Sequence, residues 1–120
     1  MSTALQDGLS GRLNEEWHRV GELAVMFSAG SCYGVDIEGR RLGFFLVQGA
    51  VYAIDDICTH GNARLSDGGL EAFEIECPLH AGVFDIRNGR ALCAPLTRDV
   101  TAHHVRIEDD QVYVRIEGKL

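Results

Sequence analysis

Residues 57–80 read ICTHGNARLSDGGLEAFEIECPLH, and this stretch decides the fold. Cys58-Thr59-His60 stands near its start and Cys77-Pro78-Leu79-His80 at its end, with the sixteen residues 61–76 between them. Each end supplies one thiolate and one imidazole, a donor set that suits zinc or iron–sulfur chemistry. The glycines in between and the alternating residues 73–76 predict two loops joined through a short strand.

The chain on either side of this stretch reads as short strands separated by turns. Runs of β-branched and aromatic residues bounded by Gly, Asn or Asp predict strands. We expect them at residues 33–37, 40–47, 50–55, 73–76, 83–86, 90–93, 105–107 and 112–116. Asn88-Gly89 predicts one hairpin and Asp109-Asp110 the last one, whereas only residues 15–25 have a helical period. The sequence therefore predicts an all-β fold, a small barrel or sandwich.

The composition indicates one ordinary globular domain. Of the 120 residues, 46% are hydrophobic and 24% charged, enough for a core without disulfides. The net charge of −7 argues against nucleic-acid binding, which needs clustered Lys and Arg. We see no membrane-spanning segment and no signal peptide, and expect a cytoplasmic protein. In that reducing compartment the four cysteines are expected to be thiols or metal ligands.

The order of the residue types separates the two metal chemistries. Zinc fingers usually pair Cys with Cys and His with His, whereas here each loop is mixed and Cys58-Thr59-His60 is too closely spaced for a finger. A two-iron cluster explains the mixture, because each loop can give its Cys to one iron and its His to the other. A zinc-binding structural module stays as an alternative, and visible colour would separate the two.

Over most of its length, from Trp17 to about Glu117, the chain resembles the Rieske-type 2Fe–2S ferredoxins of bacterial multicomponent ring-hydroxylating oxygenases. The resemblance rests on the segment VYAIDD at 51–56 before CTHG at 58–61, on CPLHAGVFD at 77–85, and on Asn88-Gly89 and Pro95 at the family's spacing. It implies a Rieske fold of three antiparallel sheets with a small cluster-binding subdomain. It also implies one 2Fe–2S cluster per chain, with Cys58 and Cys77 on the inner iron and His60 and His80 on the outer iron.

The same resemblance implies the function. We expect a one-electron carrier from a flavin-dependent NAD(P)H reductase to a terminal oxygenase, a monomer without a catalytic site of its own and without nucleic-acid or membrane partners. We expect a flexible leader over residues 1–15, the Rieske domain over 16–118 and the cluster-binding subdomain over about 56–96. An alternative with the same cluster is a small subunit of a larger reductase, such as assimilatory nitrite reductase.

Comparison with respiratory Rieske proteins predicts a low reduction potential. Ala63 and Leu79 stand where those proteins carry a disulfide, and Gly82 and Phe84 where they carry a Ser and a Tyr that donate hydrogen bonds to sulfur. Because such donors stabilise the reduced cluster, which carries one negative charge where the oxidised cluster is neutral, their absence predicts a midpoint of about −150 mV. Coordinated imidazoles predict a midpoint that falls with rising pH in the alkaline range.

The remaining polar and aromatic residues read as structural or as surface. Cys32 and Cys93 are expected to be buried small hydrophobes, and His103 and His104 to face opposite ways on a strand without binding metal. We expect Trp17, Phe44, Phe45, Tyr52 and Tyr113 in or beside the core. Six acidic residues flank the loops, either as a solvated face or to steer a partner: Asp55, Asp56, Asp67, Glu71, Glu74 and Glu76. Leu79 is a docking candidate, with Arg64 and Leu65 at its rim.

Overall fold

The computed structural model describes residues 17–59, 61–79, 82–94 and 98–118. The expected leader at 1–15, His60, His80 and Pro95 lie outside the described residues. The elements in chain order are β2 (His18–Glu22), α2 (Leu23–Met26), β3 (Cys32–Ile37), β4 (Arg40–Val47), β5 (Ala50–Asp55), the 3-10 helix η1 (Leu65–Asp67), β6 (Gly69–Glu71), β7 (Glu74–Glu76), β8 (Val83–Asp85), β9 (Ala102–Glu108) and β10 (Gln111–Arg115). Within the described ranges, no helix is long and apolar enough to cross a membrane.

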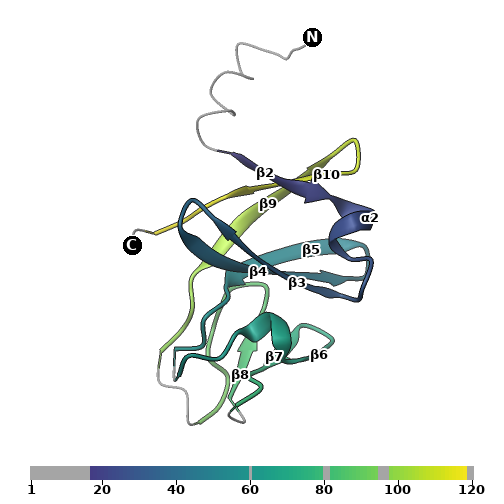
Figure 1. Ribbon diagram of the computed structural model, residues 1–120. Helices are drawn as coiled ribbons and strands as arrows, with labels where there is room; N and C mark the ends of the chain where they lie inside the picture. The colour runs from purple at the N-terminus through teal and green to yellow at the C-terminus, as the bar shows by residue number, and fades with distance from the viewer. Residues whose placement is uncertain (1–16, 60, 80–81, 95–97, 119–120) are drawn as a thin grey trace.

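The strands build one large and one small antiparallel sheet. The large sheet has the order β2-β10-β9-β5-β4-β3, and the small sheet the order β6-β7-β8. Two halves of three strands make up the large sheet, because β5 and β9 pair at just Ala53↔His103 and Ile54↔Ala102. Figure 1 shows the small sheet at the opposite end of the molecule from β2 and β10. The predicted all-β fold of three antiparallel sheets is confirmed, the two halves counting as separate sheets.

Two-residue turns set the register of the long hairpins. Glu38 and Gly39, between β3 and β4, both have positive φ (53° and 79°), and so do Gln48 and Gly49, between β4 and β5 (53° and 82°). This pattern is that of type I′ turns, whose twist matches that of the flanking strands. Ile37 therefore pairs with Arg40, and strands β4 and β5 have the predicted bounds 40–47 and 50–55.

Strands β4 and β5 separate two hydrophobic cores. Phe44 and Ala53 belong to a core with the β10 residues Val112 and Val114. Their neighbours Phe45 and Ile54 belong to a second core, which the small sheet shares through Ile75 and Phe84. Each buried Phe contributes roughly 1.5–3 kcal/mol on its own face. Because both faces are covered, β4 lacks the polar alternation of a half-buried strand, and the second core lies next to the predicted ligand loops.

Three local predictions were wrong. Within the range 15–25 that has a helical period, residues 18–22 form strand β2 and residues 23–25 belong to the single turn α2, because β2 pairs with β10 and this long-range pairing overrides the local pattern. The expected strand at 90–93 contributes an isolated bridge, Phe84↔Ala91, although the Leu92 N–H donates to the Val83 carbonyl at 2.8 Å. The Gly-rich segment between the two cysteines was expected to be a loop, but it contains the 3-10 helix η1 and the short strand β6.

Candidate metal centre

Cys58 and Cys77 bring two buried sulfur donors into the same core. Cys58 follows β5 and Cys77 follows β7, and each is 3% exposed. Both belong to the second core, beside Ile75 and Phe84. All four cysteines of the chain are thiols rather than disulfides. Two buried thiols from separate loops suit a metal cluster, for which thiolates are soft ligands.

The two loops that follow these cysteines are built alike. The Cys58 N–H donates to the Ala63 carbonyl oxygen at 2.9 Å, and the Cys77 N–H donates to the Gly82 carbonyl oxygen at 2.9 Å. In each loop the acceptor stands five residues after the cysteine, and the predicted histidine stands between donor and acceptor. The same backbone hydrogen bond therefore closes both loops, at the same spacing from the cysteine.

Of the four predicted ligands, the structure describes Cys58 and Cys77. His60 and His80 lie outside the described residues. Among the residues that are described, no three His, Cys, Asp or Glu side chains gather as a metal site. What fits a cluster here is the donor chemistry: two buried thiols, each followed within three residues by a histidine.

A buried carboxylate holds the first loop in place. Asp56 is 0% exposed and accepts hydrogen bonds from the Ser66 N–H (2.7 Å), the Ser66 hydroxyl (2.8 Å) and Arg41 Nε (3.0 Å). Its backbone N–H donates to the Arg41 carbonyl, and its own carbonyl accepts from the Leu65 N–H. These residues form the Asp56 network (Asp56, Arg41 and Ser66), which ties both ends of the segment around Cys58 to strand β4.

Two glycines on paired strands make the room for this network. Gly34 of β3 and Gly43 of β4 are direct cross-strand partners. An added Cβ would lie 2.9 Å from Asp56 Oδ2 at Gly34, and 2.6 Å from Asp56 Oδ1 at Gly43, both closer than real Cβ contacts. Sequence reasoning missed Gly34, Gly43, Arg41 and Ser66. A glycine inside a strand marks a close approach, and this signal stood at both strand positions.

A second carboxylate network joins β4, β5, β9 and the C-terminal segment. The Glu117 N–H donates to His103 Nδ1 at 2.9 Å, so the ring proton lies on Nε2, which donates to Asp55 Oδ1 at 2.9 Å. Arg40 Nε also donates to Asp55 Oδ1, at 3.1 Å. Burial raises the pKa of the Asp55 carboxyl, but the hydrogen bonds from His103 and Arg40 outweigh it and hold that pKa below its usual value.

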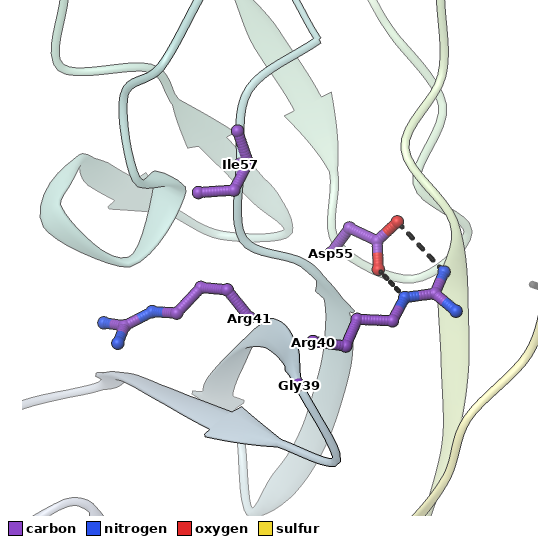
Figure 2. A pocket seen from close by; sticks show the side chains of 5 residues that line it. All are labelled: Gly39, Arg40, Arg41, Asp55 and Ile57. Carbon is purple, nitrogen blue, oxygen red and sulfur yellow. Dashed lines mark hydrogen bonds and ion pairs between the residues drawn. The ribbon is translucent and has the colours of Figure 1, made fainter. Parts of the chain in front are cut away.

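A surface pocket lies beside this network, and its charged lining residues pair with one another or with Asp56. It has a volume of about 240 Å³ and is lined by Gly39, Arg40, Arg41, Asp55 and Ile57. Figure 2 shows the Arg40 guanidinium turned toward Asp55, while Arg41 points to the other side. Both arginines are engaged with carboxylates, Arg40 with Asp55 and Arg41 with Asp56. These two ion pairs therefore hold the end of β5, which leads into the first loop, against strand β4.

The second loop rests on the small sheet. Ile75 and Phe84, directly paired between β7 and β8, are both 0% exposed. Asp85 accepts hydrogen bonds from the Arg87 guanidinium (2.9 Å) and the Arg87 N–H (2.9 Å). The hydrogen bond from the Arg87 side chain is the main reason why the pKa of Asp85 is lowered. Arg87 also lies 4.3 Å from the centre of the Phe73 ring, a cation–π contact that joins the turn after β8 to the residue before β7.

Several predictions for individual residues are confirmed. His103 is buried and His104 exposed, on opposite sides of β9. Phe44 and Phe45 are fully buried, and three aromatic residues are half-buried: Trp17, Tyr52 and Tyr113. Leu79 is exposed over 69% of its surface, and its role in docking stays a prediction. Cys32 is half-buried against the second core, where burial and then the charge of Asp56 raise the pKa of its thiol.

Three other predictions were wrong. Cys93 is exposed, because the segment around it adds no strand to the small sheet. Leu65 is 0% exposed and packs in the second core, so it cannot rim a docking surface. Asp56 is neither part of a solvated face nor a steering charge, because it is buried in its network. Of the other acidic residues, four are exposed: Asp67, Glu71, Glu74 and Glu76.

Comparison with known proteins points to one family. A family model described as "Rieske [2Fe-2S] domain" matches residues 16–107. The ferredoxin component of the naphthalene 1,2-dioxygenase/salicylate 5-hydroxylase systems of Ralstonia sp. is 49% identical over 88 residues, which cover 73% of this chain and 85% of that protein.

Solved structures agree with the sequence relatives. The ferredoxin of carbazole 1,9a-dioxygenase from Nocardioides aromaticivorans IC177 is 32% identical with a TM-score of 0.79, covering 85% of this chain and 99% of that chain. A chain from a complex of reduced oxygenase and oxidized ferredoxin in carbazole 1,9a-dioxygenase is 34% identical with a TM-score of 0.79, covering 89% of this chain and 99% of that chain. The similarity therefore extends over nearly the full length of both matched chains.

Proposed function

The chain belongs to the Rieske [2Fe–2S] domain family, and from this premise we propose that it is the ferredoxin component of a bacterial ring-hydroxylating dioxygenase system. It holds a Rieske-type 2Fe–2S cluster and carries one electron at a time to a terminal oxygenase. The observation that supports this role most directly is the pair of equivalent loops, each with a buried thiol in the same core.

The ligand assignment is part of the proposal. Cys58 and Cys77 bind the inner iron, and His60 and His80 bind the outer iron. The burial of both thiols supports the first half, and the position of each histidine inside a closed loop supports the second. When bound, the cluster takes up and releases one electron. The chain's own residues keep water from the thiolates through the second core, and the Asp56 network ties the first loop to strand β4.

The proposal gives the carrier two partners, and the relatives support it because they are named as ferredoxin components of dioxygenase systems. A flavin-dependent NAD(P)H reductase supplies the electron, and the terminal oxygenase, not this chain, performs the chemistry on the aromatic substrate. We place the monomeric carrier in the cytoplasm. Its Rieske domain spans residues 16–118 and the cluster-binding part spans about 56–96, a division that the second core supports because it draws on both loops and the small sheet.

Exposed apolar side chains support docking at the loops. Ile57 precedes Cys58 and is 40% exposed, and Leu79 follows Cys77 in the second loop. Leu92, next to the bridge to Phe84, is 46% exposed. A contiguous patch of exposed apolar residues is typical of an interaction site, and we propose that these three side chains contribute to one. We expect a small and transient interface, because each turnover requires release.

The ligand assignment is tested by iron and acid-labile sulfide analysis with EPR of the dithionite-reduced protein. We expect about two irons and two sulfides per chain and a Rieske spectrum. Cys58→Ser and Cys77→Ser should lose the spectrum, while Cys32→Ser and Cys93→Ser, the chain's other two thiols, should keep it. Full iron content in Cys77→Ser would contradict the assignment.

The carrier role is tested by electron transfer. The reduced protein is mixed anaerobically with the oxidised oxygenase of the Ralstonia naphthalene system, whose own ferredoxin is 49% identical. We expect oxidation of this protein and reduction of the oxygenase at matching rates, and slower transfer from Leu79→Gln, which removes the apolar side chain without adding a charge, at an unchanged midpoint potential. A protein with an intact cluster that reduces no ring-hydroxylating oxygenase would contradict the role.

A further inference from the structure

Thr59 and Arg98 join two loops by a reciprocal pair of hydrogen bonds. The Thr59 hydroxyl donates to the Arg98 carbonyl oxygen at 2.9 Å, and the Arg98 guanidinium donates to the Thr59 carbonyl oxygen at 3.1 Å. Thr59 stands between Cys58 and His60, whereas Arg98 comes 39 residues later, on the chain leading into β9. We call this pair the Thr59–Arg98 clamp. It ties the first ligand loop to a segment that carries no ligand.

Both sides of the clamp are anchored in the fold. On the first side, the Cys58 N–H bonds to Ala63. Beyond Arg98, Asp99 Oδ1 accepts from the Ala91 N–H at 2.8 Å, and the Val100 N–H donates to the Gly89 carbonyl at 2.9 Å. Val100 is 6% exposed and belongs to the second core. The backbone at residue 98 is therefore held in place, and the guanidinium is aimed at the peptide group between two proposed ligands.

Within the described part of the chain, Arg98 makes no ion pair, and the carboxylate of its neighbour Asp99 accepts from the Ala91 N–H. Arg40, Arg41 and Arg87 each contact a carboxylate, of Asp55, Asp56 and Asp85. For Arg98, the described residues provide a carbonyl oxygen and no carboxylate within ion-pair distance. One-electron reduction adds one negative charge at the site beside Thr59. A cation held at that place stabilises the reduced state through Coulomb attraction.

We propose that Arg98 raises the reduction potential of the centre and that Thr59 is the residue that positions it. This inference rests on the proposed ligands Cys58 and His60. It assigns to the segment around residue 98 an electrostatic role, which is separate from any part that it plays in stability. A purely structural clamp would change thermal stability and leave the potential where it is.

The charge is tested by redox titration of the holoprotein in 10 mM salt. Removing one exposed charge should change the equilibrium constant for reduction by about two- to fivefold. Because a tenfold change corresponds to 59 mV for one electron, the midpoint of Arg98→Gln should be lower than that of wild type by about 20–40 mV. Arg98→Lys, which keeps the charge, should retain most of the wild-type value. The difference between Arg98→Gln and wild type should shrink in 1 M salt, where the Debye length falls to about 3 Å.

Arg19→Gln is the matched control. Arg19 is also an exposed arginine that donates to a neutral oxygen, Gln111 Oε1 at 2.8 Å, but it lies on β2, far from the ligand loops in Figure 1. Its midpoint should equal that of wild type. An unchanged midpoint in Arg98→Gln, or an equal fall in Arg19→Gln, would overturn the electrostatic role.

The positioning role is tested by a double-mutant cycle. Thr59→Val should lower the midpoint by part of the Arg98→Gln effect, whereas Thr59→Ser, which keeps the hydroxyl, should have the wild-type midpoint. The midpoint of the double variant should be no lower than that of Arg98→Gln, because both substitutions act on the same interaction. Shifts that add in full would overturn the role of Thr59. These outcomes are read on protein with a full Rieske EPR signal, so that they stay distinct from a failure of the ligand assignment, which shows as loss of iron.

Discussion

Replacing the buried Asp56 by alanine should destabilise the holoprotein more than any other single carboxylate removal near the ligand loops. The change leaves the Ser66 N–H, the Ser66 hydroxyl and Arg41 Nε without the acceptor that they now reach at 2.7, 2.8 and 3.0 Å. Breaking a buried ion pair from one side costs about 3–5 kcal/mol. Arg41 is 22% exposed and keeps a weaker contact to Asp36 at 3.8 Å, so partial rehydration favours the lower end, about 3 kcal/mol.

This loss is large against the total stability of a domain, about 5–15 kcal/mol. For a chain of this length, 3 kcal/mol lowers Tm by about 10–20 °C. The assay is thermal unfolding followed by circular dichroism and by the visible absorbance of the cluster. Because the Asp56 network holds both ends of the first loop, we expect the two signals to fall at the same temperature in Asp56→Ala.

Asp36→Ala is the matched control for this experiment. Asp36 contacts the same arginine, but its side chain is 74% exposed, so its removal should cost less than about 1 kcal/mol. Ser66→Ala, which removes only the hydroxyl bond to Asp56, should fall between the two. If Asp56→Ala and Asp36→Ala melt within about 3 °C of each other, the reasoning from burial is refuted.

Three further predictions concern the packing, the acid stability and the redox chemistry. Gly43→Ala should cost about 1–3 kcal/mol, because its methyl group would lie 2.6 Å from Asp56 Oδ1, whereas Gly69→Ala, which meets nothing within 4 Å, should be neutral in the same thermal melts. The lowered pKa of Asp85, caused mainly by its hydrogen bond from Arg87, provides stability that is complete above the unfolded value of about 3.9 and is lost as pH falls through the lower folded value. Asp85→Asn should therefore flatten the fall of Tm between pH 5 and pH 2, and an equally steep fall would argue against this role of Asp85. With Gly82 and Phe84 in place of hydroxyl donors, the midpoint potential should lie at about −150 mV and fall with pH in the alkaline range. A midpoint well above zero, or one constant up to about pH 10, would disprove this expectation.

Much of the fold could be predicted because the signals are local. The two-residue turns at Glu38-Gly39 and Gln48-Gly49 set the bounds of β4 and β5, since type I′ turns demand positive φ at both residues. The cysteines of the two loops were recognised by their type and spacing, and burial of both is in line with that prediction. The helical period at 15–25 was misleading because pairing with β10, some ninety residues away, makes residues 18–22 a strand.

The polar interior could not be predicted from the sequence. Asp56 looked like one member of an acidic surface because its neighbour Asp55 and the glutamates around the small sheet are similar in type. Its partners Arg41 and Ser66 stand fifteen and ten residues away, and the room for it comes from Gly34 and Gly43 on two other strands. Whether a carboxylate is buried depends on all of these at once.

The sequence by itself determined the donor types, their spacing in two mixed loops, the all-β class and the hairpin register, because each of these depends on neighbours along the chain. The tertiary structure alone decided that β4 and β5 have a core on both faces, that Asp56 is buried while Cys93 is exposed, and that Arg98 reaches Thr59. The physical reason is that the energy of a buried charge or a long-range hydrogen bond depends on partners that only folding brings together, and no local pattern in the sequence records them.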